Sequence, residues 1–376
     1  MNTTGLLKFS DLESARFDMR IVRGRVDNIV PRELATEILT SNCDVAIVRI
    51  PSQYSSSVSA LQRWALPVLH GDTLVYYKCD LYHYEVPPPR NTDIEFTQAN
   101  GADLEELRAI VDLTFRDYVS HYHANPLFPR DKILAGYQQW AESYATNPEC
   151  TLWIARRSGR LAAFAACRND AANSEAEGIL YGVNPQDAGG GLYGDLIRHT
   201  QSDAKNRGIR IMKVSTQVGN FAVQKVWARE GFHLFEALDT FHINAMLTAG
   251  EIAAERMVSF DATTVGKFSE LSGDANEIHL DDKAARAAGF PSRIAHGVLA
   301  ASEFSKILGT ETPGRGTIFG NFSLAFLRPL IVGEQYRLQM RIPGGVRPGH
   351  MQAVMTIREQ DNQLCVLARS DVFLKR

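Results

Sequence analysis

The sequence predicts an α+β protein whose domains follow one another along the chain, with the main boundary near residue 250. Its 376 residues exceed what one hydrophobic core usually organises, so two or three domains are expected. The middle of the chain alternates strand, helix and strand patterns around a glycine-rich turn. The last third instead contains one long apolar helix followed by strands of alternating pattern.

Residues 1–90 are expected to form an N-terminal α/β subdomain. Apolar runs at 43–51 and 73–81 predict strands, and the segment between them predicts a loop that leads into a helix. The proline-rich stretch 87–90 interrupts this pattern, because proline fixes φ and lacks a backbone N–H. We therefore expect a second domain at residues 91–248.

The second domain is expected to combine amphipathic helices with strands. Residues 102–115 repeat apolar positions at helical spacing and have acidic residues in the first turn. Residues 151–167 predict two strands across a Ser-Gly turn. A strand at 176–185, a helix at 191–208 and a strand at 209–216 complete a β-α-β order, with glycines where the helix begins.

A third domain is expected at residues 257–376, after a break at 245–256. A strand is expected at 257–265 and a long helix at 295–309. The remaining strands alternate apolar and polar residues, at 321–330, 334–342, 351–360 and 364–374.

Composition and charge favour small-molecule chemistry over binding to nucleic acid or to a membrane. Apolar residues make up 45% and charged residues 22% of the chain, and no apolar run is long enough to span a bilayer. The formal net charge is −3, with 25 basic against 29 acidic residues over 1–249 and 15 against 14 over 250–376, so neither half has the basic excess expected of a nucleic-acid binder. Five scattered cysteines without a CxxC pair indicate reduced thiols and no structural metal site. The N-terminus lacks the basic start and apolar run of a secretory signal, so a cytoplasmic location is expected.

The glycine-rich turn lies within residues 183–197, just before a predicted helix. Such a turn exposes unpaired backbone N–H groups at the positive end of the helix dipole, and this arrangement suits a pyrophosphate. A flexible loop or an ordinary helix entry is the alternative interpretation of a glycine run.

This stretch resembles motif A of the GNAT N-acyltransferases, V-x-P-x-x-R-G-x-G-x-G/A. Ala188 replaces the arginine and Tyr193 replaces the last glycine. Residues 215–235 resemble motif B of the same family, with Trp227 in place of the usual tyrosine. The resemblance implies a coenzyme A thioester as co-substrate and no permanently bound cofactor. The residues expected to bind the coenzyme are Val183, Gly189, Gly190, Gly191, Leu192, Tyr193, Asn220 and Trp227.

Trp227 alters the chemistry that the resemblance implies. In the family, the tyrosine at this position commonly protonates the departing CoA thiolate, and an indole cannot do so at neutral pH. Either solvent or another group then supplies the proton, or the chemistry of the transferase domain is impaired.

The acceptor side resembles transferases that act on nucleotide-linked amino sugars. Residues 12–18 loosely copy an N-terminal entry segment of those enzymes, and residues 115–129 with 137–141 resemble their acceptor region. The sugar amine must be neutral to attack a thioester, so a base is expected near it. The candidate bases are His121, His123 and His242, and the candidate substrate contacts are Tyr122 and Asn125. Each histidine has an alternative as a surface or core residue, and water can take the proton instead.

The stretch SGDANEIH places an acid, Asp274, five residues before an imidazole, His279. Local rules predict a capped turn here, which leaves His279 and the AHG at 295–297 unexplained. Together the two stretches resemble the MaoC-like, (R)-specific enoyl-CoA hydratases of the hotdog fold. Their pattern is S-G-D-x-N-P-I-H-x-D followed by F-x-x-x-I-A-H-G-M-L-x-x-S. Glu277 replaces the proline and Val298 replaces the methionine.

Hydration of an α,β-unsaturated thioester needs the residue types of this stretch. A carboxylate and an imidazole that hold one water molecule can remove a proton from it and deliver a proton to C2 from the same face. We expect Asp274 and His279 to be this pair. The resemblance places the backbone N–H of Gly297 at the thioester oxygen. The expected substrate-side residues are Ser272 and Asn276.

Both halves use acyl-CoA, which predicts a bifunctional enzyme that prepares its own acyl donor. The hydratase would convert crotonyl-CoA into 3-hydroxybutanoyl-CoA. The resemblance implies transfer of that acyl group to a dTDP-linked amino-deoxy sugar of a surface polysaccharide, such as the O-antigen of lipopolysaccharide. In one alternative the hotdog domain is a silent dimerisation module, and in another the transferase half is a relic. A homo-oligomer is expected, because pairing of hotdog domains usually extends their sheet.

Overall fold

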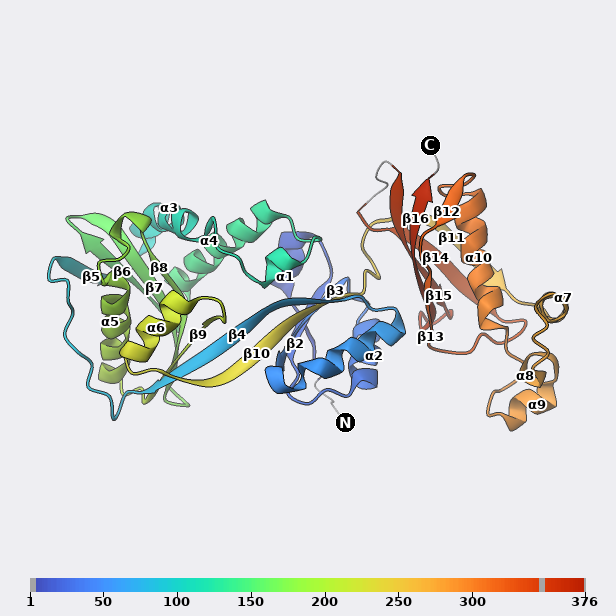
Figure 1. Cartoon of the computed structure of the whole chain (residues 1–376), viewed down its shortest axis with the longest axis horizontal. Helices are drawn as coiled ribbons and strands as arrows, with labels where there is room; N and C mark the ends of the chain where they lie inside the picture. The colour runs from blue at the N-terminus through green and yellow to red at the C-terminus, as the bar shows by residue number, and fades with distance from the viewer. Residues whose placement is uncertain (1–4, 345–348, 375–376) are drawn as a thin grey trace. The chain divides into compact units, whose positions relative to one another are not determined.

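The computed structural model describes residues 5–344 and 349–374 (Figure 1). Contacts divide the chain into two compact units. The first unit contains Met1–Val48, Ser56–Leu69 and His242–Arg376, and the second contains Arg49–Ser55 and His70–Phe241. The expected domain boundaries, 1–90, 91–248 and 257–376, stay predictions.

The second unit is built on a mixed β-sheet covered by helices. Its strands lie in the order β10-β4-β9-β8-β7-β6-β5. Their bounds are β4 (Val68–Asp80), β5 (Ile94–Gln98), β6 (Cys150–Arg157), β7 (Arg160–Asp170), β8 (Glu175–Val183), β9 (Ile211–Gln217) and β10 (His233–Asn244). The helices are η2 (Gly101–Asp103), α3 (Leu104–Phe115), η3 (His121–Ala124), α4 (Arg130–Thr146), η4 (Pro185–Asp187), α5 (Leu192–Asn206) and α6 (Phe221–Arg229).

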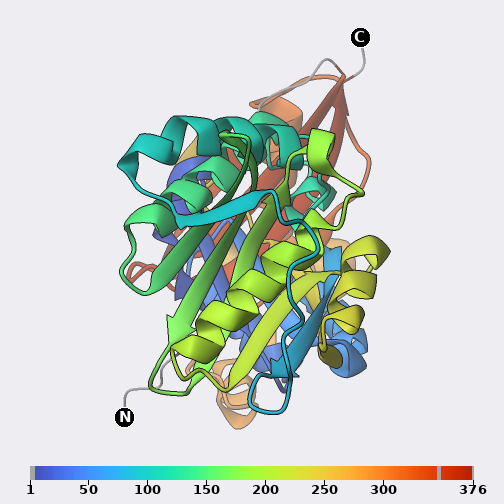
Figure 2. The same cartoon turned by 90° about the vertical axis from the view of Figure 1, so that its left-hand side faces the viewer.

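Alternate residues of β7 contact different helices and so define the layers. Phe164 packs against Phe115 of α3, with ring centroids 6.5 Å apart. Ala163 and Ala165 instead share a buried cluster with Leu196 of α5. Because successive side chains of a strand point to opposite faces, α3 and α5 cover opposite faces of the sheet. Figure 2 shows α5 lying across the face nearer the viewer.

Strands β8 and β9 separate part-way along their length. They pair in parallel from Glu175↔Ile211 to Gly178↔Val214, although both strands continue beyond that point. Backbone N–H and C=O groups past the last pair have lost their ladder partner and are available to another extended molecule. The divergence therefore opens a binding position in the middle of the sheet.

The C-terminal part of the first unit is an antiparallel sheet around one long helix. The sheet order is β11-β14-β15-β16-β12, and β13 also pairs with β16. The strands are β11 (Glu251–Ser259), β12 (Thr317–Phe319), β13 (Ser323–Phe326), β14 (Gln335–Ile342), β15 (His350–Arg358) and β16 (Leu364–Leu374). The helices are α7 (Ala262–Ser272), α8 (Glu277–Leu280), α9 (Asp282–Ala287) and α10 (Gly297–Thr310).

The helix α10 and the sheet share one apolar core. The helix buries residues at the i, i+4, i+7 and i+8 positions of a helical face, namely Ala300, Phe304, Ile307 and Leu308. Strand β14 buries every second residue, namely Tyr336, Leu338, Met340 and Ile342. The two periodicities meet in one layer, and this places the N-terminus of α10 at the edge of the core.

The N-terminal part of the first unit has strands in the order β1-β2-β3. Its elements are β1 (Lys8–Phe9), α1 (Asp11–Phe17), β2 (Ile21–Arg25), α2 (Pro31–Thr40), β3 (Val45–Pro51) and η1 (Ser52–Trp64). Within the described parts of the chain, no helix combines the length and apolarity needed to cross a membrane.

Two segments differ from the sequence-based expectation. The strand expected at 257–265 begins earlier, at Glu251, and a helix starts at Ala262 instead. The reason is local, because the Asp261 side chain accepts a hydrogen bond from the Thr264 N–H at 2.7 Å and so caps the helix. Residues 52–64, expected as a loop leading into a helix, form one long 3-10 helix.

Candidate active sites

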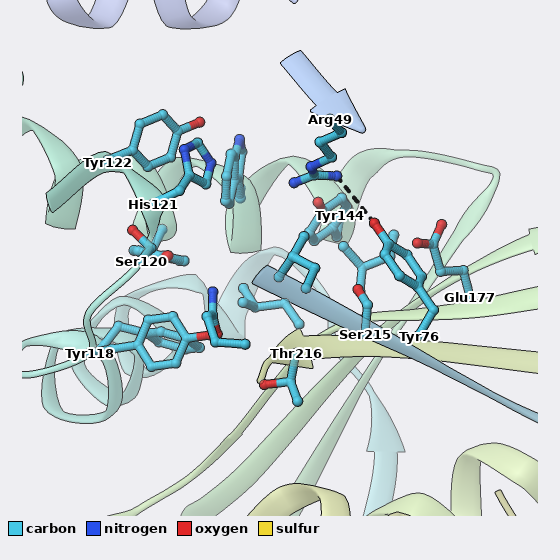
Figure 3. A pocket seen from close by; sticks show the side chains of 17 residues that line it. Arg49, Tyr76, Tyr118, Ser120, His121, Tyr122, Tyr144, Glu177, Ser215 and Thr216 are labelled. Atoms are coloured by element: carbon cyan, nitrogen blue, oxygen red, sulfur yellow. Dashed lines mark hydrogen bonds between the residues drawn. The ribbon is translucent and has the colours of Figure 1, made fainter. Parts of the chain in front are cut away.

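A pocket of about 220 Å³ opens in the second unit beside the divergence of β8 and β9 (Figure 3). Many aromatic side chains line it, among them Tyr76 on β4, Tyr118 and Tyr122 near η3, and Trp140 and Tyr144 on α4. Flat aromatic walls suit a sugar or a nucleobase, because their faces stack on planar or apolar surfaces.

Arg49 and Glu177 supply the charged groups of this pocket. Arg49 Nη1 donates to the Tyr76 hydroxyl at 3.4 Å, whereas its Nε is buried and has no acceptor among the described residues. A buried guanidinium N–H without a partner is costly, so it favours an acceptor oxygen brought by a ligand. Glu177 is ion-paired with Arg168. The sequence patterns pointed to neither pocket residue.

Of the three candidate bases, the structure brings only His121 into the pocket. His121 is 5% exposed and its ring lies 3.9 Å from that of Tyr122, which also lines the pocket. His123 turns back to accept a hydrogen bond from the Ser120 N–H at 3.1 Å. Burial lowers the pKa of the His123 imidazole, although the Ser120 backbone contact opposes this effect. Asn125 is buried and accepts from the Leu127 N–H at 3.2 Å.

His242 lies on β10 with no exposed surface and does not line the pocket. Burial lowers the pKa of its imidazole from 6.5 to about 4, and the positive charge of Arg23 acts in the same direction. The ring is therefore neutral in the folded protein at physiological pH, and its position assigns it to the core.

A pH-dependent loss of stability is expected from His242. The unfolded chain binds a proton near pH 6.5 and the folded chain only near pH 4, so the stabilisation is complete above pH 6.5 and is lost as the pH falls. From pH 7.5 to pH 5 the free energy of unfolding should fall by about 2 kcal/mol through this group. Urea titrations at both pH values should show that His242→Met loses about that much less. The exposed His83→Gln should behave like the wild type, and an unchanged pH difference in His242→Met would refute the assignment.

The glycine turn has the geometry of an anion cradle. Gly189 and Gly191 have φ angles of 82° and 84°, and a Cβ at Gly189 would meet nothing within 4 Å. Gly191 is the N-cap of α5, whose first N–H groups lie beyond the intrahelical ladder. The Asp195 carboxylate accepts from the backbone N–H groups of Arg90 and Asn91 at 2.7 and 2.9 Å. This fastens the proline-rich segment beside the turn.

Two arginines stand near the turn although Ala188 lacks the motif's guanidinium. A small cavity of about 60 Å³ is lined by Gly191, Arg90 and Arg229, among others. The Arg90 Cδ lies 3.8 Å from the point where a Gly191 Cβ would be. Positive charge reaches the cradle from a segment far away in the sequence, and motif comparison alone missed it.

A second cavity, of about 90 Å³, occupies the divergence itself. Tyr193, Asn220 and Trp227 line it on the helix side. Tyr118 and Thr216 border both this cavity and the larger pocket, so the two are neighbours. Val183 ends β8, and Leu192 is buried beneath the first turn of α5. Of the predicted coenzyme residues, Tyr193, Asn220 and Trp227 thus line the cavity next to the pocket, and Gly191 lines the separate cavity at the turn.

Another candidate site lies in the first unit, just before the helix α10. Ligand atoms of Asp274, His279 and His296 are all within 4.8 Å of one another. The His279 Nδ1 lies 2.7 Å from the Ile294 carbonyl oxygen, and a carbonyl only accepts. Nδ1 therefore carries the hydrogen, and Nε2 keeps its lone pair. Asp274 is exposed, while both histidines are buried. The three groups are close enough to share one water molecule or one cation.

His296 contacts both Asp274 and His279. Its Nε2 donates to the Asp274 carbonyl oxygen at 3.0 Å, and its ring stacks on that of His279 with centroids 3.9 Å apart. The Ser269 hydroxyl donates to the same carbonyl at 2.8 Å. Two donors on one carbonyl hold the Asp274 backbone, which leaves the carboxylate to face solvent.

The remaining predicted residues shape the loop. The Ser272 hydroxyl accepts from the Asp274 N–H at 3.2 Å, and Asn276 caps α8 by accepting from the Ile278 N–H at 3.3 Å. Gly297 is the first residue of α10, where a Cβ would come within 2.8 Å of the Phe326 ring. Its N–H belongs to the unpaired first turn of the helix, as an oxyanion donor requires.

The cradle beside diverging parallel strands and the acid–imidazole pair beside a helix N-terminus define an α+β protein with two enzyme-like sites. Comparison with known proteins gives the families. Residues 107–232 match the Acetyltransferase (GNAT) family, and residues 246–363 match the MaoC like domain. The chain thus has a GNAT fold followed by a C-terminal hotdog domain, and the predicted fold class is confirmed.

Individual relatives cover parts of the chain. It is 40% identical to the (R)-specific enoyl-CoA hydratase of Aeromonas caviae over 83 residues, 22% of this chain and 62% of the relative. It is 36% identical to the 3-hydroxybutyryl-CoA dehydratase of Methylorubrum extorquens over 75 residues, 20% of this chain and 48% of the relative. A GCN5-related N-acetyltransferase structure from Sphaerobacter thermophilus has 16% identity and a TM-score of 0.39, and the match covers 53% of this chain and 59% of that one.

Proposed function

We propose that the protein is a bifunctional enzyme. Its hotdog domain would hydrate a short enoyl-CoA such as crotonyl-CoA to the (R)-3-hydroxyacyl-CoA. Its GNAT domain would transfer the 3-hydroxyacyl group to the amine of a dTDP-linked amino-deoxy sugar for surface polysaccharide synthesis. The observation that carries this proposal is the juxtaposition of the Asp274 carboxylate with the His279 Nε2 lone pair at the N-terminus of α10.

The hydration follows from this juxtaposition. A water molecule held between the Asp274 carboxylate and His279 Nε2 gives up one proton as its oxygen attacks C3. The same pair returns that proton to C2, so both new bonds form on one face and the product keeps all three atoms of the water. Negative charge that develops on the thioester oxygen would be stabilised by the Gly297 N–H at the positive end of α10.

The transfer step uses the second unit. The CoA pyrophosphate would lie on the N–H groups of Gly189–Leu192, with Arg90 and Arg229 as counter-charges. The pantetheine arm would then follow the divergence of β8 and β9 to the larger pocket. There the acceptor amine attacks the thioester, with His121 as the nearest candidate base. Arg49 would bind an acceptor oxygen, and an anionic diphosphate oxygen best matches a guanidinium.

Mass spectrometry of products tests both activities at once. The full chain is incubated with crotonyl-CoA and a mixture of dTDP-linked amino sugars. We expect a hydrated acyl-CoA and an N-(3-hydroxybutanoyl) sugar, each absent without enzyme. Hydration without a sugar product would confine the function to the hotdog domain.

The alternative is an N-acyltransferase whose hotdog domain only dimerises. It is favoured by apolar side chains at the β12–β13 edge, where Phe319 and Phe326 are 38% and 52% exposed, and by Phe373 of the neighbouring strand β16, which is 45% exposed. An uncovered edge with large apolar residues favours pairing with a second copy. The two proposals share the homo-oligomer and differ only in hydration activity.

A further inference from the structure

Two departures from the transferase motifs meet in one cavity of the second unit. Tyr193, from the first turn of α5, stands where the motif has glycine. Trp227, from α6, stands where the motif has tyrosine. Both side chains line the cavity of about 90 Å³ between β8 and β9. The two exchanges therefore keep a phenol in this space, beside those of Tyr118 and Tyr181, although it comes from a different helix.

Release of a thiolate from a thioester needs a proton donor close to the sulfur. The indole N–H of Trp227 does not ionise at neutral pH and cannot serve. Among the phenols of this cavity, Tyr118 donates to Gln217 Oε1, and Tyr181 donates to Thr200 Oγ1 at 2.9 Å. Tyr193 makes no such bond within the described residues, so its O–H can turn to a ligand.

The neighbours of Tyr193 suit a donor. The Trp227 side chain is 3% exposed and lines the same cavity as Tyr193, and its buried Nε1 has no hydrogen-bond partner among the described residues. An indole N–H can only donate, so Trp227 does not compete for the phenol hydrogen of Tyr193. Burial raises the pKa of Tyr193, which keeps it protonated, and the Trp227 N–H acts in the opposite direction by favouring the phenolate. Trp227 thus acts as a positioning residue for Tyr193.

We propose that Tyr193 is the catalytic acid that protonates the departing CoA thiolate. This inference rests on the proposed transferase function. The amine nitrogen forms a bond to the acyl carbon, the carbon–sulfur bond breaks, and the sulfur takes the Tyr193 proton. The new amide nitrogen releases one proton to water, and the Tyr193 phenolate takes one back from water. The sum is amine plus acyl-CoA giving amide plus CoA thiol.

Four forms of the full chain test the assignment. They are the wild type, Tyr193→Phe, the control Tyr82→Phe, and the double variant Tyr193→Phe with Trp227→Tyr. Thiol release from acetyl-CoA is measured with the dTDP-amino sugar mixture and, separately, with hydroxylamine as a small surrogate amine. Calorimetric titration with CoA and thermal unfolding report binding and folding in each form.

Tyr193→Phe is expected to lose about 100-fold in kcat with unchanged CoA affinity, as for removal of a general acid. Tyr82→Phe removes a phenol that is 76% exposed and lies outside this cavity, and it should stay within about threefold of the wild type. The double variant restores a phenol on α6 and should recover at least about tenfold over Tyr193→Phe, which a purely structural role would not produce.

The experiment distinguishes failure of the Tyr193 assignment from failure of the proposed transferase function. An active wild type with Tyr193→Phe equal to it would overturn the acid assignment and leave the transferase function standing. A folded Tyr193→Phe that is slow but gains nothing from Trp227→Tyr would also count against it. A wild type that releases no thiol with either amine would overturn the transferase function and, with it, this inference.

Discussion

Replacement of Asp274 by asparagine is expected to lower kcat for hydration of crotonyl-CoA by about 100- to 10,000-fold. The amide keeps the size of the side chain and can still accept from the Asn276 N–H, as Asp274 Oδ1 does at 3.2 Å. It cannot take a proton from water, however, so the water between this side chain and His279 Nε2 loses its base. Loss of enoyl absorbance measures the rate directly.

The matched control is Glu277→Gln, which makes the same acid-to-amide change three residues further on. Glu277 is exposed at the start of α8 and touches neither histidine in any recorded hydrogen bond. Its hydration rate should stay within about threefold of the wild type. If Asp274→Asn instead hydrated crotonyl-CoA at the wild-type rate, Asp274 would have no part in the reaction. If the wild type itself hydrated nothing, the hotdog domain would be a dimerisation module, and the alternative function would stand.

The proposed hydratase site could be described from sequence because its parts are local. Asp274 and His279 lie on one loop, and the turn that joins them is formed by its own side chains, such as Ser272 and Asn276. His296, the third residue of the site, comes from the next motif along the chain, and the helix α10 begins directly after it. A short motif therefore contains nearly all the geometry. Two features could not be predicted from the motif. They are the solvent exposure of the Asp274 carboxylate and the tautomer of His279, which is set by the carbonyl of Ile294.

The proposed acceptor pocket could not be predicted in the same way, because it is formed by strands that the sheet order brings together. Arg49, Tyr76 and Glu177 lie on β3, β4 and β8, which are far apart in the sequence. The histidines near Tyr122 looked like a cluster, but a single capping hydrogen bond turns His123 back onto Ser120. His242 falls on an inward position of β10, where burial and not chemistry explains it. The spacing of residues along the chain therefore does not show which histidines enter the pocket and which are buried elsewhere.

The unsatisfied guanidinium of Arg49 gives the second large prediction, a selective loss of acceptor affinity. Arg49→Met keeps an apolar stem of similar length and removes the charge and the buried Nε–H. A charge-assisted hydrogen bond contributes about 1.5–3 kcal/mol, so KM for the dTDP-amino sugar should rise by about 10- to 100-fold.

The affinity for acyl-CoA should not change in Arg49→Met, because Arg49 lines the larger pocket and is not part of the cradle at Gly189–Leu192. Arg116→Met, an exposed arginine ion-paired with Asp112 on α3, is the charge-matched control and should leave both constants unaltered. Arg49→Lys should recover part of the affinity, since it restores the charge without the planar fork. Initial rates with each substrate varied in turn separate these cases. A rise in KM for acyl-CoA alone would place Arg49 on the donor side, whereas unchanged constants would mean that its buried Nε–H has no part in acceptor binding.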